Sequence, residues 1–395
     1  MIRREFLASL AAPLTRRTAE NRYAPFDKLM TGFLAEHGVP GASVAVSHDH
    51  RVAYAKGFGF ADVEAKAPVE TRSLFRIASI SKPITAVAVL QLVDAGKIDL
   101  EQPILDFVHI RPAQRLDPRW YLVTVRHCLQ HTGGWDRSIT PDPIAIPWQI
   151  AKALGTKPPV PLEDVIRYTM MQPLDHDPGT KFAYSNVGYL LLGRAIAEAS
   201  GRHYEEYVRK EVLAPLGISD MELGRALPEH RAKSEVSYYD AKQAEGSCLY
   251  PPRVNERVPF PDGAGNVEAY EAHGGWIASA SSLVKFALAF DLPPFCPILS
   301  RRAIRTMFAP PRSLPGTTDD AWYGCGWIVR RAGLNALNTF HNGYISGSST
   351  LLVRRHDGWN WAVLFNSERS KNGKTLSNLI DPLMHLAVNE VIAAG

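Results

Sequence analysis

The two ends of the chain combine helical and strand-like patterns of apolar residues. Apolar side chains from Phe26 to Leu34 recur at helical spacing and predict a helix that ends near Gly38. Residues 42–47 and 51–56 alternate apolar and polar positions around a polar triplet, which predicts a β-hairpin. Towards the other end, helices are predicted at 280–288 and 376–392, and successive antiparallel strands at 324–330, 338–344, 349–354 and 361–365.

The middle of the chain has a different pattern. Between residues 101 and 258, helical periodicity and proline-containing loops dominate, and alternating stretches are few. We therefore predict an α+β protein in which an antiparallel sheet flanked by helices is built from residues 23–100 and 259–395, and a mostly helical domain is inserted at 101–258. The length of 395 residues also favours two domains. A cleft between them is the natural position for a site.

Residues 77–96 predict a helix that is buried for most of its length. Its apolar side chains recur at helical spacing, and Gly96 is a suitable C-terminal stop. Pro83 places Ser79 and Lys82 in the first turn, where a missing N–H costs little. The two residues then share one helix face, near the positive end of the helix dipole. A hydroxyl beside an amine and free backbone N–H groups is an arrangement that activates a nucleophile.

This S-x-x-K pattern is weak evidence when taken alone. It is expected about once by chance in a chain of this length, and a second copy occurs at residues 282–285. The alternative interpretation is that Ser79 caps the helix and that Lys82 is a solvated residue of the first turn.

A second candidate is the Y-S-N sequence at residues 184–186, the only Y-x-N triplet in the chain. Free tyrosine has a pKa near 10, so Tyr184 needs neighbouring cations to accept a proton at neutral pH. Asn186 offers an amide that can hold Lys82 or a substrate carbonyl. The alternatives are a partly buried aromatic residue for Tyr184 and a helix N-cap for Asn186.

The third candidate is the H-x-G pattern of His341 and Gly343. Similar H-x-G sequences begin at His131 and His273, but His341 is the one that enters a predicted strand. Glycine there lets a substrate backbone approach and pair with the strand edge, and the imidazole could hydrogen-bond Tyr184 or the candidate serine. A structural histidine is the alternative.

Charge and composition exclude several classes of function. The net charge is only +4 and basic residues are scattered, so nucleic-acid binding is not indicated. The chain has no run of 18 apolar residues, so we expect no stable membrane insertion. Four cysteines lie far apart without a C-x-x-C pair and indicate neither a metal site nor a need for disulfides: Cys128, Cys248, Cys296 and Cys325.

Residues 1–22 differ from the rest of the chain. They contain an R-R-x-F-L sequence followed by a short apolar run, which resembles a twin-arginine export signal and predicts a periplasmic or secreted protein. The apolar run is short and no A-x-A cleavage site follows it, so a disordered N-terminus of a cytoplasmic protein is the alternative.

Taken together, S-x-x-K, Y-S-N and H-x-G in this order resemble the serine β-lactamase and penicillin-binding-protein superfamily. The closest resemblance is to its branch of class C β-lactamases, D-aminopeptidases and family VIII esterases. The resemblance spans roughly residues 26–392. Further short sequences that resemble this branch occur at 129–134, 182–189, 274–279 and 323–327.

The resemblance implies a role for each residue. Ser79 is the acyl-accepting nucleophile, and Lys82 is its proton partner. Tyr184 is the general base for acylation and the general acid toward the leaving group, while Asn186 orients Lys82 and the substrate. The backbone N–H groups of Ser79 and Tyr344 would form the oxyanion hole.

His341 takes the position of the lysine in the K-T-G pattern of relatives. A cation that would bind a substrate carboxylate is thereby lost or becomes pH-dependent, which favours esters, amides or peptides over penicillins. We predict a serine hydrolase that forms an acyl-enzyme with a small-molecule or peptide substrate (an ester, an amide or a β-lactam-like compound), without a metal or cofactor. The alternatives are an acyltransferase of the same fold and a penicillin-binding sensor without turnover.

Overall fold

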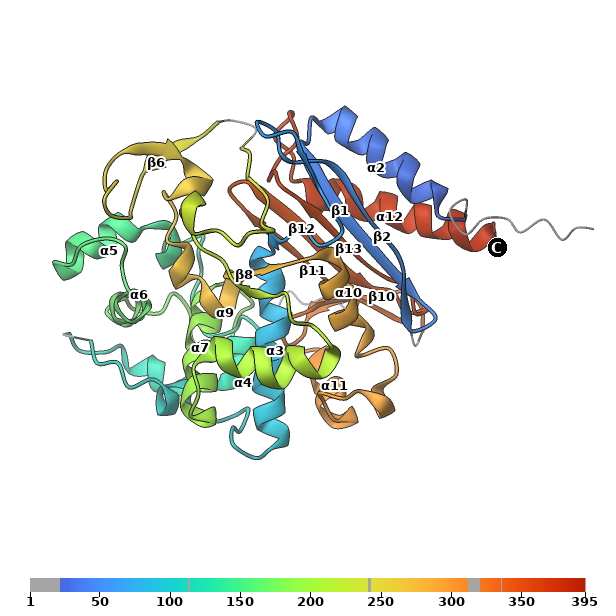
Figure 1. The fold of residues 1–395 in the computed structure, drawn as a ribbon. Helices are drawn as coiled ribbons and strands as arrows, with labels where there is room; N and C mark the ends of the chain where they lie inside the picture. Colours follow the sequence, from blue (N-terminus) through green and yellow to red (C-terminus); the bar gives the residue numbers. More distant parts are fainter. Residues whose placement is uncertain (1–21, 113, 241–242, 312–319, 335, 395) are drawn as a thin grey trace, which may run out of the picture.

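The sheet at the centre of the protein is built from both ends of the chain (Figure 1). The computed structural model describes residues 22–112, 114–240, 243–311, 320–334 and 336–394. Eight strands are arranged in the order β3-β2-β1-β13-β12-β11-β10-β9, and every neighbouring pair is antiparallel. They are β1 (Gly41–His48), β2 (Arg51–Asp62), β3 (Ala67–Pro68), β9 (Ala321–Tyr323), β10 (Ile328–Arg331), β11 (Leu337–Ile345), β12 (Ser348–Arg354) and β13 (Asn360–Phe365).

Both faces of this sheet are buried, and alternate residues of the central strands face opposite sides. In β13, Val363 packs in the smaller of the two clusters that cover the sheet, whereas its neighbours Ala362 and Leu364 pack in the larger one. The same alternation divides Val44 from Ala45 in β1. Successive side chains of a strand point to opposite faces, so a strand covered on both sides is apolar throughout.

Helices cover the two faces unequally. The terminal helices α2 (Ala24–His37) and α12 (Leu376–Ala393) pack together on one face (Figure 1). On the other face, α10 (Ala280–Leu288) lies against the central strands, and α3 (Ser81–Asp94) runs between the sheet and the middle of the chain. The predicted α+β architecture, with an antiparallel sheet flanked by helices, is therefore confirmed.

The middle of the chain supplies most of the remaining helices. These middle helices are α4 (Val125–Leu129), α5 (Pro147–Leu154), α6 (Leu162–Met170), α7 (Val187–Ser200) and α8 (Tyr204–Tyr207). Two more follow later in the chain, α9 (Glu271–Gly274) and α11 (Arg301–Phe308). Short strands form two small sheets: β4 (Phe75–Arg76) with β8 (Trp276–Ala278) and β5 (Glu222–Leu223), and β6 (Glu245–Ser247) with β7 (Arg257–Pro259). The domain division at residues 101 and 258 stays a prediction, and the largest hydrophobic cluster draws residues from both sides of it.

One detail differs from the sequence-based expectations. The strand predicted at 324–330 begins only at Ile328, because Gly324 to Trp327 form a turn between β9 and β10 in which Gly326 has φ +80°. The predicted N-terminal signal lies almost wholly outside the described residues. In the part of the chain that the structure describes, no helix is both long and apolar enough to span a membrane.

Candidate active site

Ser79 lies in a tight turn that leads into the buried helix α3. The turn is a 3-10 helix (Ala78–Ile80), and α3 follows directly from Ser81. Pro83 has no N–H to close an α-helical bond to the carbonyl of Ser79, which explains why the tighter turn precedes the helix. Ala78 has φ +47°, a left-handed conformation that is strained for a residue with a side chain. Strain of this kind directly before a partly exposed serine marks a candidate functional position.

Lys82 is fully buried and directs its amine to three oxygens. Its Nζ lies 3.1 Å from Ser79 Oγ, 2.8 Å from Asn186 Oδ1 and 2.8 Å from the carbonyl oxygen of His273. Burial lowers the pKa of Lys82 well below its ordinary value; the charge of Arg137 lowers it further, and that of Asp142 opposes the shift. The alternative of a solvated lysine is therefore wrong, and burial favours the neutral form of the amine that lies beside the serine hydroxyl.

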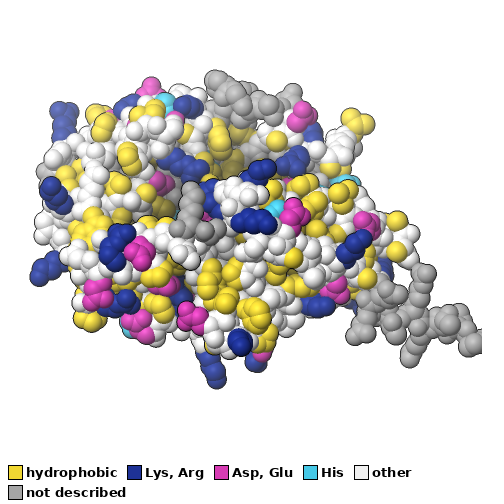
Figure 2. All heavy atoms as spheres, turned by 90° about the horizontal axis from the view of Figure 1, so that it is seen from above, with side chains coloured by type: hydrophobic (Ala, Val, Ile, Leu, Met, Phe, Trp, Pro, Cys, Tyr) yellow, Lys and Arg dark blue, Asp and Glu magenta, His cyan; other side chains and the backbone are white. Residues whose placement is uncertain are grey.

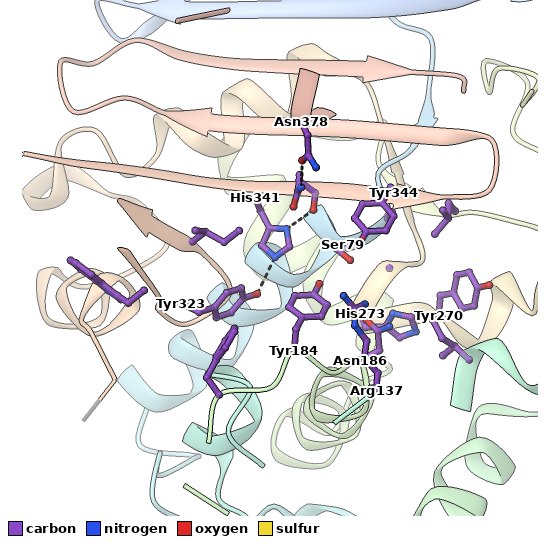
Figure 3. A pocket seen from close by; sticks show the side chains of 18 of the residues that line it. Ser79, Arg137, Tyr184, Asn186, Tyr270, His273, Tyr323, His341, Tyr344 and Asn378 are labelled. Carbon is purple, nitrogen blue, oxygen red and sulfur yellow. Dashed lines mark hydrogen bonds between the residues drawn. The ribbon is translucent and has the colours of Figure 1, made fainter. Parts of the chain in front are cut away.

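Tyr184 and Asn186 are positioned by the loop that enters α7. The hydroxyl groups of Tyr184 and Ser79 face each other (Figure 3), and Lys82 Nζ lies 5.0 Å from the centroid of the tyrosine ring. Burial raises the pKa of Tyr184, although its interaction with Ser79 and the charge of Arg137 act in the opposite direction. The phenol is thus held in its protonated form at neutral pH, not as the phenolate that a general base requires.

Asn186 occupies the N-cap position of α7, but its side chain makes no capping hydrogen bond. Its Oδ1 accepts from Lys82, and its Nδ2 donates to Asp142 Oδ2 at 2.9 Å. Because that carboxylate can only accept, it fixes the orientation of the amide and keeps the amide oxygen toward the lysine. Asp142 was missed by the sequence analysis, since no local pattern links it to a residue 44 positions later.

His341 is buried and binds a different tyrosine from the one expected. Its Nε2 lies 3.0 Å from the hydroxyl of Tyr323, and its Nδ1 lies 2.6 Å from the carbonyl oxygen of Asn342. The carbonyl can only accept, so Nδ1 carries the proton and Nε2 accepts from Tyr323. Burial lowers the pKa of His341 to about 3, with a further contribution from Lys82. The expected hydrogen bond to Tyr184 or Ser79 is therefore corrected, and the ring is neutral at neutral pH.

Gly343 lets β11 pass directly beside the serine turn. A Cβ atom at this position would lie 2.2 Å from the carbonyl oxygen of Ile77 and 3.0 Å from the backbone nitrogen of Ser79. Pairing of β11 with β10 ends at Phe340, so the following residues are not covered by β10. Tyr344 is 41% exposed and lines the cavity next to this segment. Its predicted oxyanion role stays a prediction.

The two histidines that the sequence analysis set aside also lie at this site. The ring of His131 packs 4.2 Å, centroid to centroid, from that of Tyr184. His273 supplies the carbonyl that accepts from Lys82, and its own ring lines the cavity. In contrast, the second S-x-x-K pattern lies elsewhere: Ser282 is buried in α10 and donates to Asp220 Oδ1 at 2.6 Å. His131, His273 and His341, which begin H-x-G sequences, thus all lie at the site, whereas only one of the two S-x-x-K sequences does.

These groups surround a cavity of about 610 Å³. Figure 3 shows Ser79, Tyr184 and Tyr344 around its centre, with His341 and Tyr323 on one side and Asn186, His273 and Arg137 on the other. In the space-filling view a hollow with hydrophobic side chains is bordered by lysine and arginine side chains (Figure 2). The site thus combines a partly exposed hydroxyl, a buried amine and a phenol with room for a small organic substrate.

No metal centre is evident within the described ranges, where no group of three or more histidine, cysteine or acidic residues could hold an ion. The four cysteines are free thiols, and burial raises the pKa of Cys128 and Cys325.

An antiparallel sheet covered by helices, with a serine-lysine-tyrosine cluster where the sheet meets the helical segment, defines a protein of the serine β-lactamase and penicillin-binding-protein type. The Beta-lactamase family model matches residues 26–381, and the chain belongs to this family.

Relatives of several kinds are similar to this chain. Penicillin-binding protein 4* of Bacillus subtilis is 28% identical over 78% of this chain and 63% of its own length. Esterase EstB of Burkholderia gladioli is 30% identical over 65% of this chain and 64% of its own length. The chain thus spans less than two thirds of each of these two proteins.

Solved structures show the same fold. An octameric penicillin-binding protein homologue from Pyrococcus abyssi superposes with a TM-score of 0.69 at 28% identity, over 91% of this chain and 77% of that one. The D-amino acid amidase of Ochrobactrum anthropi SV3 gives a TM-score of 0.71 at 21% identity, over 95% and 99% of the two chains. The latter likeness concerns the fold alone.

Proposed function

We propose that this protein is a serine hydrolase that cleaves an ester or amide through a covalent acyl-enzyme on Ser79. The observation that carries the proposal is the contact of the Ser79 hydroxyl with both Lys82 Nζ, at 3.1 Å, and the phenol of Tyr184 at the cavity. Membership of the Beta-lactamase family and similarity to an esterase support the same class of reaction.

The protonation states of Lys82 and Tyr184 favour a different role for each of these two neighbours of Ser79. The neutral amine of Lys82 accepts the serine proton as Ser79 Oγ bonds to the substrate carbonyl carbon. The protonated phenol of Tyr184 then donates its proton to the departing alcohol or amine as the ester or amide bond breaks. Acylation therefore leaves an ammonium and a phenolate beside the acyl-enzyme.

Hydrolysis restores both groups. Water attacks the acyl carbon and gives one proton to the phenolate of Tyr184, while Ser79 Oγ leaves and recovers its proton from Lys82. The sum is one ester or amide and one water converted to an acid and an alcohol or amine. Asn186 and the carbonyl of His273 hold the amine of Lys82 in place through the cycle.

The decisive experiment combines turnover with active-site labelling. The wild-type protein should hydrolyse 4-nitrophenyl butyrate continuously and react with a fluorophosphonate probe, and Ser79→Ala should lose both. Ser282→Ala is the matched control, because Ser282 belongs to the second S-x-x-K pattern and lies outside the cavity lining; it should keep both activities.

Two outcomes would contradict the proposal. Labelling that persists in Ser79→Ala would mean that another residue is the nucleophile. A single burst of nitrophenol without further turnover would indicate a protein that is acylated once, as a sensor is.

A further inference from the structure

One charged residue lines the cavity. Among the described lining residues, Arg137 alone has a permanently charged side chain, and no aspartate or glutamate lines the cavity with it. Its guanidinium carbon lies 4.9 Å from the centroid of the Tyr184 ring (Figure 3). An acyl group or leaving group in this cavity is therefore close to a positive charge, whereas the nearby carboxylate of Asp142 is bound to Asn186 and does not line the cavity.

The guanidinium of Arg137 is available for a ligand. Its side chain is exposed, and within the described ranges it takes part in no hydrogen bond or ion pair. The carboxylates near it in sequence have other partners. Asp136 accepts from Lys181 Nζ at 2.9 Å, and Asp142 accepts from Asn186 Nδ2 at 2.9 Å.

Among the lining residues that the structure describes, no other group supplies a cation. His341 is a neutral ring held by Tyr323 and by a backbone carbonyl. Lys82 directs its amine to Ser79, to Asn186 and to a backbone carbonyl, away from the open cavity.

We propose that Arg137 is a substrate-binding residue that binds a carboxylate, so that the preferred substrate is an ester or amide that also carries a negative charge. Guanidinium is suited to this task because its planar fork forms two parallel hydrogen bonds with a carboxylate. The assignment deepens the proposed hydrolase function and rests on it, but the binding step can be measured without turnover.

The spacing between charge and scissile bond follows from Tyr184. Its hydroxyl interacts with Ser79 and its ring centroid lies 4.9 Å from the Arg137 guanidinium carbon, so a short aliphatic chain can join a carboxylate on Arg137 to a carbonyl at Ser79. Derivatives of adipic acid, whose two carboxyl carbons are joined by four methylene groups, suit this separation.

The test measures binding to the Ser79→Ala protein, which cannot form the acyl-enzyme. N-(4-nitrophenyl)adipamic acid and its methyl ester differ in one negative charge, and calorimetry gives the affinity of each. We expect the anion to bind about two- to fivefold more tightly, as for an exposed charge pair, and the preference to shrink as salt is raised. Adding Arg137→Gln should abolish the preference, whereas Arg137→Lys should keep part of it.

Arg51→Gln is the matched control. Arg51 is exposed at the start of β2 and is not among the cavity-lining residues, so its loss removes the same charge without touching the site. Equal affinity for the two compounds in Ser79→Ala, or a preference that survives Arg137→Gln, would overturn the assignment. Wild-type turnover of the corresponding 4-nitrophenyl esters is scored separately. If the wild-type protein hydrolysed neither of the two esters, the hydrolase proposal would be refuted. The binding data would still decide the role of Arg137.

Discussion

The state of His341 predicts how stability changes with acid. Burial lowers its pKa to about 3 in the folded protein, whereas an unfolded chain has the ordinary value of about 6.5. Below pH 6.5 the unfolded state therefore binds a proton that the folded state does not, and stability falls as the pH falls toward 3. The slope for one such proton is about 1.4 kcal/mol per pH unit, which amounts to about 2 kcal/mol between pH 6.5 and pH 5.

His341→Gln removes this proton while keeping a polar side chain near Tyr323. Urea unfolding followed by tryptophan fluorescence, repeated from pH 7.5 to pH 5, gives the free energy of unfolding at each pH. The wild-type protein should lose about 2 kcal/mol more than the variant over this range, whatever the variant loses at pH 7.5. His131 and His273 are also buried with lowered pKa values, so a slope of the same sign should remain in the variant.

The control for this experiment is His230→Gln. His230 is exposed in the folded protein, so its surroundings change little on unfolding and the slope should match that of the wild type. If the free energy of unfolding of His341→Gln has the wild-type dependence on pH between pH 6.5 and pH 5, the imidazole of His341 is not held neutral. In that case β11 does supply a cation to the cavity.

Three further outcomes test the site. Tyr184→Phe should slow hydrolysis of alkyl esters by about 100-fold or more and that of 4-nitrophenyl esters much less, because only a poor leaving group needs the proton; equal losses would exclude the acid role. Asp142→Asn should shift the rising limb of the pH–kcat/KM profile to lower pH, since Asp142 raises the pKa of Lys82; an unmoved limb would contradict this coupling. Gly343→Ala should lower kcat about 100-fold, because its Cβ displaces β11 from the Ser79 turn. Gly32→Ala is the control and should leave kcat unchanged, because a Cβ there meets no atom within 4 Å. Equal kcat values for the two variants would show that the approach of β11 to the Ser79 turn does not matter.

The local patterns predicted regular elements best where one periodicity dominates. The helix at 280–288 was predicted with its observed bounds, and the helix at 376–392 to within one residue, whereas the strand predicted at 51–56 continues to Asp62. The errors occur where glycine turns interrupt a pattern. Residues 324–327 read as part of a strand, but they turn because Gly324 lies against the backbone of Met307 and Gly326 adopts a positive φ. Such contacts are made by distant parts of the chain and leave no periodic trace.

The sequence predicted which residues form the candidate site better than it predicted the contacts between them. The order of three short patterns indicated Ser79, Tyr184 and His341, and the structure brings all three to one cavity. The partner of His341 and the place of His273 were not predictable. Tyr323 and the carbonyl of His273 reach the site through the pairing of strands and the path of loops, which side-chain patterns do not encode.

The sequence by itself determined which elements form and which side chains are available: a buried helix that begins beside a serine and a lysine, strands at both ends, and a tyrosine before a helix. Periodicity and turn chemistry are local properties, so they can be read from neighbouring residues. Only the tertiary structure decided the protonation of these groups. Burial removes Lys82 and His341 from water and disfavours their charged forms, and burial is a property of the assembled core rather than of any single segment.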